Sequence, residues 1–168
     1  MYASTQDSTS LAPMEFTIAT VGAADLDDLL PLLGGYRDFY EVPVTDEQLL
    51  AISRALLADP AREGVQLIAR DATDPAHPAL GFATLYWTWT TTRGGRLAVM
   101  NDLFVAPDAR GHGVADALIL ACRDRAAAHG AVDLEWMTAL DNHRAQAVYD
   151  RVGGQRSQWL SYSLEITP

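Results

Sequence analysis

Hydrophobic and polar positions along the chain follow two repeating patterns, and these patterns predict its secondary structure. Apolar runs or a two-residue alternation, as in strands, occur in six segments: 15–19, 65–70, 80–90, 96–105, 133–138 and 158–166. Apolar residues recur every three or four positions, as in helices, in four others: 25–33, 45–57, 113–129 and 142–152. This order predicts an α/β fold with a mixed, mostly antiparallel sheet, one parallel crossing and flanking helices.

Local signals place the ends of several helices. Thr45 and Gln48 have the spacing of a capping box, so the second helix is expected to begin there. Gly34-Gly35 interrupts the first helical pattern and is expected to end that helix. Gly130 is expected to end the third helix.

The segment from Leu103 to Leu118 reads as a strand, a glycine-bearing turn and the start of a helix. Gly111 and Gly113 let the backbone approach a ligand closely, because they lack side chains. The first amides of a helix have no partner within the helix and carry partial positive charge. The sequence therefore predicts a phosphate-binding turn at this junction.

Two common phosphate-binding motifs do not fit this turn. A Walker loop needs a lysine, which the chain lacks, and a dinucleotide-binding loop needs a third glycine where Asp116 stands. The pattern Arg110-x-x-Gly113-x-Ala115, directly after Asp102-Leu103-Phe104-Val105-Ala106-Pro107, instead resembles the pyrophosphate-binding motif of the GCN5-related N-acetyltransferases (GNAT). Asn142-x-x-Ala145-x-x-x-Tyr149 resembles a second motif of the same family.

The resemblance implies the GNAT acyl-CoA N-acyltransferase fold, with acetyl-CoA as co-substrate and no metal. It implies that backbone amides of the turn and the Arg110 side chain bind the cofactor pyrophosphate. It also implies that the strand before the turn bulges, so that an amide polarises the thioester carbonyl and the strand pairs with the pantetheine arm. The residues assigned to the cofactor are Leu103, Phe104, Val105, Arg110, Gly111, His112, Gly113, Val114, Ala115, Asn142, Ala145 and Tyr149.

The resemblance also assigns acid–base roles. Tyr149 matches the family's general acid, which protonates the departing thiolate. Asp102 is the first candidate for the proton acceptor, and Glu135 and Glu41 are the alternatives. Related diamine acetyltransferases carry a glutamate where this chain has Asn101, so their base does not transfer directly.

The acceptor substrate is expected to contact residues from two regions. The segment between the first two helices lines the acceptor site in the resembled family, which makes Tyr36, Tyr40 and Glu41 candidate contacts. Asn101 and Asp102 complete this set. The alternative is that the tyrosines pack in the core and that Glu41 is solvated.

Composition narrows the choice of partners. The chain has 168 residues and a formal net charge of −10, which disfavours nucleic acid and anionic membranes as partners and suits a cationic substrate.

One domain is expected over residues 14–168, after a disordered segment at 1–13. Cys122 is the single cysteine and is expected in the core, so no disulfide framework is predicted. No apolar run reaches about 18 residues, and a cytoplasmic location is expected.

The sequence therefore predicts an N-acetyltransferase that transfers an acetyl group from acetyl-CoA to a primary amine of a small, cationic molecule by direct attack. The alternatives are a protein or peptide N-acetyltransferase and a non-catalytic acyl-CoA-binding module. A homodimer is possible, because the alternating segment from Trp159 to Ile166 could support one.

Overall fold

The computed structural model describes residues 14–166, so the predicted disorder of residues 1–13 lies outside the described residues. The chain divides into two compact units, one up to Met137 and one from Thr138 onward, and each is described by itself. No helix within residues 14–166 is both long and apolar enough to cross a membrane.

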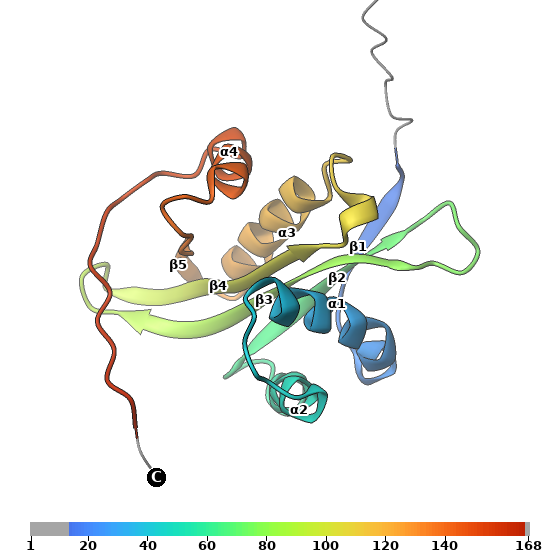
Figure 1. Ribbon diagram of the computed structural model, residues 1–168. Coiled ribbons are helices and arrows are strands. Elements are labelled where there is room, and N and C mark those ends of the chain that lie inside the picture. Colours follow the sequence, from blue (N-terminus) through green and yellow to red (C-terminus); the bar gives the residue numbers. More distant parts are fainter. Residues whose placement is uncertain (1–13, 167–168) are drawn as a thin grey trace, which may run out of the picture. The chain divides into compact units, whose positions relative to one another are not determined.

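The first unit is built on a five-stranded sheet with the strand order β1-β2-β3-β4-β5 (Figure 1). Neighbouring strands run antiparallel from β1 to β4, and β5 runs parallel to β4. The strands are β1 (Phe16–Thr20), β2 (Gly64–Asp71), β3 (Ala79–Thr90), β4 (Gly95–Val105) and β5 (Ala131–Glu135). The predicted mixed, mostly antiparallel sheet with one parallel crossing is confirmed.

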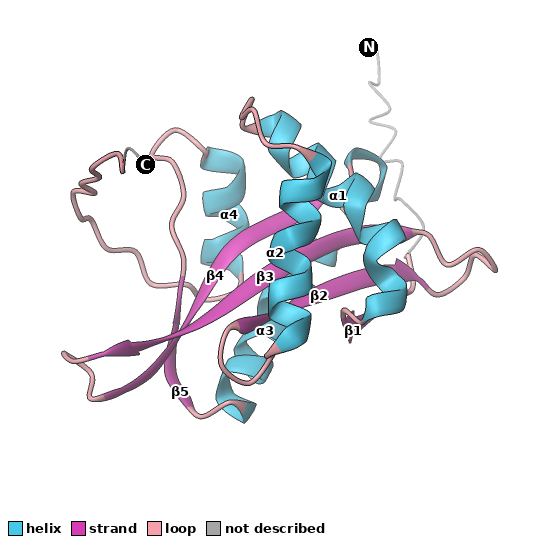
Figure 2. Ribbon diagram, turned by 90° about the horizontal axis from the view of Figure 1, so that it is seen from below, coloured by secondary structure: helices cyan, strands magenta, loops and turns pink. Residues whose placement is uncertain are grey.

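Helices of the first unit cover both faces of this sheet. Helices α1 (Leu26–Phe39) and α2 (Asp46–Ala58) lie on one face, and α3 (Val114–Ala128) lies on the other (Figure 2). The capping box predicted for α2 is present: Thr45 Oγ1 accepts from the Gln48 amide at 3.3 Å, and Gln48 Oε1 accepts from the Thr45 amide at 2.8 Å.

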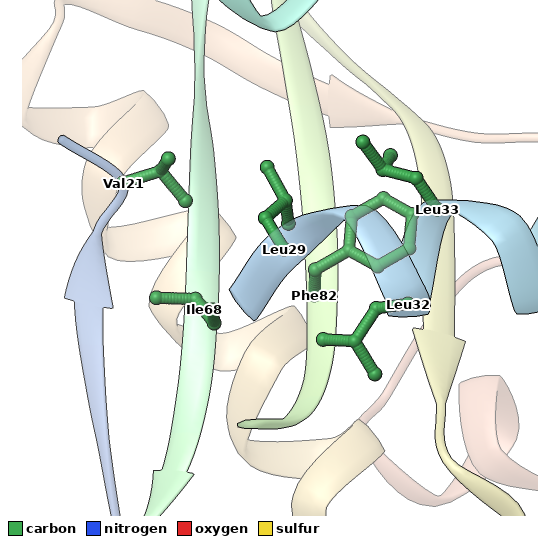
Figure 3. Packing of buried hydrophobic residues seen from close by; sticks show 6 residues of the cluster. All are labelled: Val21, Leu29, Leu32, Leu33, Ile68 and Phe82. Atoms are coloured by element: carbon green, nitrogen blue, oxygen red, sulfur yellow. The ribbon is translucent and has the colours of Figure 1, made fainter. Parts of the chain in front are cut away.

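A buried cluster joins α1 to the sheet. Leu29 and Phe82 are fully buried, and the cluster is completed by Val21, Leu32, Leu33 and Ile68 (Figure 3). Burying each of these larger side chains contributes about 1.5–3 kcal/mol, so this cluster fixes α1 on the sheet. The position of the residues that follow on α1 depends on this packing.

The prediction that Gly34-Gly35 ends the first helix is wrong, because α1 continues through both glycines to Phe39. A Cβ atom on Gly35 would lie 2.8 Å from Cζ of Phe104, so the absence of a side chain here allows the helix to pack closely on β4. Tertiary packing thus outweighs the low helix propensity of glycine.

The second unit contains α4 (His143–Arg151), whose N-cap is Asn142 as predicted. The prediction of a strand at 158–166 is wrong, because the structure assigns no strand there. The apolar residues that alternate along this segment are exposed: Trp159 is 89%, Tyr162 88% and Leu164 95% exposed. Alternation specifies a strand only where a partner strand supplies the ladder, and this unit contains none among its described residues.

Candidate active site

The turn between β4 and α3 has the backbone geometry of an anion-binding site. After a 3-10 turn at Pro107–Ala109, Gly111 and Gly113 adopt left-handed conformations, with φ of 87° and 82°. Gly113 is the N-cap of α3, and a Cβ atom added to it would meet nothing within 4 Å. The space beside the first amides of α3 is therefore open. Anions bind in this position at the N-termini of helices.

Arg110 lies beside this turn in a defined orientation. Its Nε donates a hydrogen bond to the carbonyl oxygen of Val105 at 3.0 Å, and its guanidinium carbon lies 5.8 Å from the centre of the Phe104 ring. These contacts hold the guanidinium next to the glycines, where it can add charge-assisted hydrogen bonds to a phosphate. His112 is half-buried, and Val114 is buried, so both contribute to the turn through their backbone.

Strand β4 contains a bulge just before the turn. Thr84 of β3 faces Asp102, whereas Leu85 faces Met100, so Asn101 has no counterpart on β3. On its other side β4 pairs with β5 only from Arg96 to Val99. In the described part of the first unit, β4 therefore runs beyond β5 with one edge unpaired at Leu103, Phe104 and Val105. Unpaired strand amides and carbonyls can bind an extended ligand as a further strand would.

The bulge brings the Asp102 carboxylate under α1. Asn101 Nδ2 donates to Asp102 Oδ1 at 2.9 Å, and the hydroxyls of Thr84 and Tyr36 face the carboxylate and lower its pKa as further donors. The ring of Tyr36 packs edge-on against Phe104, with 6.4 Å between the ring centres. Residues from α1, β3 and β4 thus converge on one carboxylate.

Burial is the largest influence on the pKa values in this cluster. It raises the pKa of Asp102 above its usual value, although the hydrogen bonds from Thr84, Asn101 and Tyr36 offset part of this effect. The pKa of Tyr36 is raised by burial and then by the charge of Asp102, and so is that of Tyr86. Among the described residues no cation stabilises the charge of Asp102. A partly buried carboxylate without a cationic partner can accept a proton or bind an ammonium group.

The comparison with protein families decides what this arrangement is. The model of the Acetyltransferase (GNAT) family matches residues 31–154, which is more than half of the chain. The chain belongs to the GNAT family. The predicted family and fold are confirmed, and so is the prediction of an acyltransferase enzyme, with N-acetyltransferase activity of the GNAT type.

Individual GNAT relatives agree with this assignment. The chain is 32% identical over 144 residues to a protein of Bacillus subtilis (strain 168) named uncharacterized N-acetyltransferase YhfO. The aligned region covers 85% of this chain and 93% of that protein. The crystal structure of a probable acetyltransferase is 29% identical, with a TM-score of 0.76 and coverage of 90% of this chain and 99% of that one. The aminoglycoside N-acetyltransferase AAC(6')-Iy in complex with CoA shares the fold, at 20% identity, a TM-score of 0.77 and coverage of 92% and 99%.

The second GNAT motif forms a structured helix start in its own unit. Asn142 Oδ1 accepts a hydrogen bond from the Ala145 amide at 3.2 Å, so Asn142 caps α4. Tyr149 lies on α4 and is half-buried, as is Ala145. The catalytic and cofactor roles of these three residues stay predictions.

The predicted substrate contacts differ in how they are placed. Asn101 and Tyr36 both face the Asp102 carboxylate, to which Asn101 donates a hydrogen bond, and Tyr40 packs on Tyr36 with 5.0 Å between the two ring centres. Glu41 is exposed and has a left-handed backbone conformation, with φ of 52°.

Glu135, an alternative proton acceptor, forms an ion pair with Arg93 at 2.9 Å. No group of three or more histidine, cysteine or acidic residues in the described chain is arranged to hold a metal.

Two residues of the site were not predicted from the sequence. Thr84 and Gln66 are buried polar residues, and Gln66 Nε2 donates to Thr84 Oγ1 at 3.2 Å. The alternation along residues 80–90 places Thr84 on the same face as Phe82, but it does not show which residue of another strand lies opposite. A polar residue in the middle of an apolar strand was the signal that could have found it.

Proposed function

We propose that this GNAT enzyme transfers the acetyl group of acetyl-CoA to a primary amine of a small, cationic molecule by direct attack. The observation that carries the proposal is the Asp102 carboxylate, which is partly buried, accepts a hydrogen bond from Asn101, faces the hydroxyls of Thr84 and Tyr36, and has no cationic partner among the described residues. The formal net charge of −10 favours the approach of a cation. That AAC(6')-Iy has been solved with CoA supports the choice of co-substrate.

The turn and the strand before it fit the co-substrate. The amides from Gly111 to Ala115 bind the pyrophosphate together with Arg110, and the open conformation of Gly113 leaves room for it. The unpaired edge of β4 at Leu103 to Val105 binds the pantetheine arm, and one of its amides donates to the thioester oxygen. Such a preorganised donor contributes about 3 kcal/mol to stabilisation of the transition state.

The reaction requires two proton transfers. The amine nitrogen attacks the thioester carbon, the carbon–sulfur bond breaks, and coenzyme A leaves as a thiolate. The amine proton goes to Asp102, directly or through water, and a raised pKa makes this carboxylate a better acceptor than an ordinary aspartate. Tyr149 gives its phenolic proton to the thiolate, and exchange with solvent restores both side chains. Asn142 and Ala145 bind the cofactor arm; these roles of the second unit rest on the motif in the sequence.

The test measures release of coenzyme A with a thiol reagent against a panel of diamines, aminoglycosides, amino acids and a peptide. Cys122 does not interfere, because it is fully buried and burial raises the pKa of its thiol to about 12. Turnover with small polycationic amines supports the proposal, and turnover with the peptide alone would refute it.

Variants separate the proposed roles. Tyr149→Phe is expected to lower kcat about 10²-fold with little change in affinity for CoA, since it removes the acid alone. Tyr162→Phe is the matched control, because Tyr162 is 88% exposed, and it should leave the rate unchanged. Equal rates for wild type and Tyr149→Phe would exclude the phenol from the reaction.

We also propose that the enzyme is a cytoplasmic homodimer. Sedimentation velocity at micromolar concentration tests the oligomeric state, and a single monomer peak would contradict this part of the proposal.

A further inference from the structure

A row of polar side chains crosses the sheet behind Asp102. Gln66 of β2 lies opposite Thr84 of β3, and Thr84 lies opposite Asp102 of β4. Residues opposite each other in a ladder project from the same face of a sheet, so the three side chains form one line under α1. Gln66 is 4% exposed and Thr84 is fully buried.

The direction of each hydrogen bond in this row is fixed by chemistry. The ionised Asp102 carboxylate only accepts, so the Thr84 hydroxyl, which lies opposite it in the ladder and lowers its pKa, can act towards it only as a donor. Thr84 Oγ1 must then accept from Gln66, which is the bond observed from Gln66 Nε2 at 3.2 Å. The Gln66 amide therefore holds the Thr84 hydroxyl in the rotamer that serves Asp102.

Stability alone does not account for this pair. A buried hydrogen-bonded pair contributes little net stability, and apolar groups of the same shape can replace both partners at almost no cost. The neighbouring positions on these strands, Ile68 and Phe82, are apolar and fully or almost fully buried. A polar pair in such surroundings therefore points to a role at the carboxylate that it reaches.

We infer that Gln66, two strands away from Asp102, is a positioning residue of the active site: through Thr84 it orients the Asp102 carboxylate towards the acceptor amine. The inference rests on the proposed role of Asp102 as proton acceptor. Gln66 lies about 10 Å from the carboxylate, the width of two strand spacings, and acts only through the threonine hydroxyl.

Other groups also face Asp102 and set the background for a titration. Tyr36 approaches from α1 with Tyr40 packed behind it, Tyr86 approaches from β3, and Asn101 lies next to Asp102 on β4. Tyr36 and Tyr86 do not ionise near neutral pH, because an unperturbed tyrosine has a pKa of about 10 and the pKa values of these two are raised. Changes at Gln66 and Thr84 can thus be read in the titration of Asp102 itself.

The experiment follows the Asp102 carboxyl carbon by NMR across a pH series, with Asp102→Asn to assign the signal, and records the pH profile of kcat/KM. Thr84→Val removes the donor to the carboxylate, so the Asp102 midpoint is expected to rise by about one pH unit. Gln66→Met removes the bond that holds the hydroxyl and should produce a smaller rise. Thr84→Ser keeps the hydroxyl and should restore the midpoint of the wild type.

A double variant separates a relay from two independent effects. Gln66→Met combined with Thr84→Val should show the same midpoint as Thr84→Val alone, because Gln66 acts through Thr84. The double variant also leaves no buried donor unpaired, which keeps the test available if Thr84→Val alone does not fold. Thr88→Val, the same change at an exposed position of β3, is the matched control and should leave midpoint and rate unchanged.

The outcomes are distinct from those of the proposed function. An unchanged Asp102 midpoint in Gln66→Met and its double variant, or additive shifts of the two single changes, would overturn the relay. Full activity of Asp102→Asn would overturn the proton-acceptor role instead, while the NMR midpoints still decide whether Gln66 governs Asp102.

Discussion

The two ends of α3 offer a matched test of the phosphate-binding turn. Gly113 precedes the helix and Gly130 follows it, with φ of 82° and 78°. A Cβ atom added to either glycine meets nothing within 4 Å. Gly113→Ala and Gly130→Ala therefore introduce the same strain without a steric clash, at opposite ends of one helix.

Both substitutions lower stability because they place an alanine in a left-handed conformation. This conformation is unfavourable by about 1–2 kcal/mol for a residue with a Cβ atom, and the lower conformational entropy of the unfolded alanine chain offsets part of that loss. Both variants are expected to lose about 1 kcal/mol of unfolding free energy, which lowers Tm by about 2–4 °C in a chain of this size.

The affinity for coenzyme A should separate the two variants. In the proposed complex, a methyl group on Gly113 stands where the pyrophosphate approaches the amides of α3, and a charged hydrogen bond is worth about 1.5–3 kcal/mol. Gly113→Ala is therefore expected to raise the Kd for coenzyme A about 10- to 100-fold, and Gly130→Ala to leave it unchanged. Calorimetric titration measures Kd, and thermal unfolding measures the shared loss of stability. Equal Kd values in the two variants would refute the assignment of the turn to the pyrophosphate.

Two further predictions concern the parts that support the site. Gly35→Ala should lower the free energy of unfolding by about 1 kcal/mol in urea titration despite the better helix propensity of alanine, because its Cβ lies 2.8 Å from Cζ of Phe104; a gain in stability would contradict this. Asp25 has a pKa below its usual value, chiefly because the Gly22 amide donates to it and further because of Arg70. A depressed pKa stabilises the fold above the unfolded value of about 3.9 and loses that effect as pH falls. Arg70→Met should therefore destabilise the protein more at neutral pH than in acid, and an equal loss at both would argue against it.

Local signals predicted those parts of the molecule that local chemistry decides. The capping box at Thr45 and the glycine-bearing turn before α3 depend on residues within a few positions, so the sequence alone was enough to predict them. The continuation of α1 through Gly35 depends instead on the Phe104 ring, which is distant in sequence. The segment 158–166 has the pattern of a strand, but a strand also needs a neighbour, and no pattern within the segment supplies one.

The same reasoning explains why the polar row behind Asp102 was missed. Alternation shows that Thr84 shares a face with Phe82, and this is compatible with either a solvated or a buried hydroxyl. Only the pairing of three strands brings Gln66 and Thr84 into line with Asp102. The sequence of a single strand does not determine its register with strands that are far away in the chain.

The bulge at Asn101 is the feature on which the geometry of the site depends. Met100 lies opposite Leu85 and Asp102 lies opposite Thr84, so two residues that regular alternation would place on the same face lie on opposite faces. If Asn101 paired regularly with Thr84 instead of bulging, Asp102 would lie opposite Ala83 and Phe104 opposite Gly81. Both side chains would then project from the other face of the sheet, away from Tyr36 and Gly35. The bulge therefore decides both that the carboxylate faces its hydroxyl donors and that α1 can pack closely on the strand.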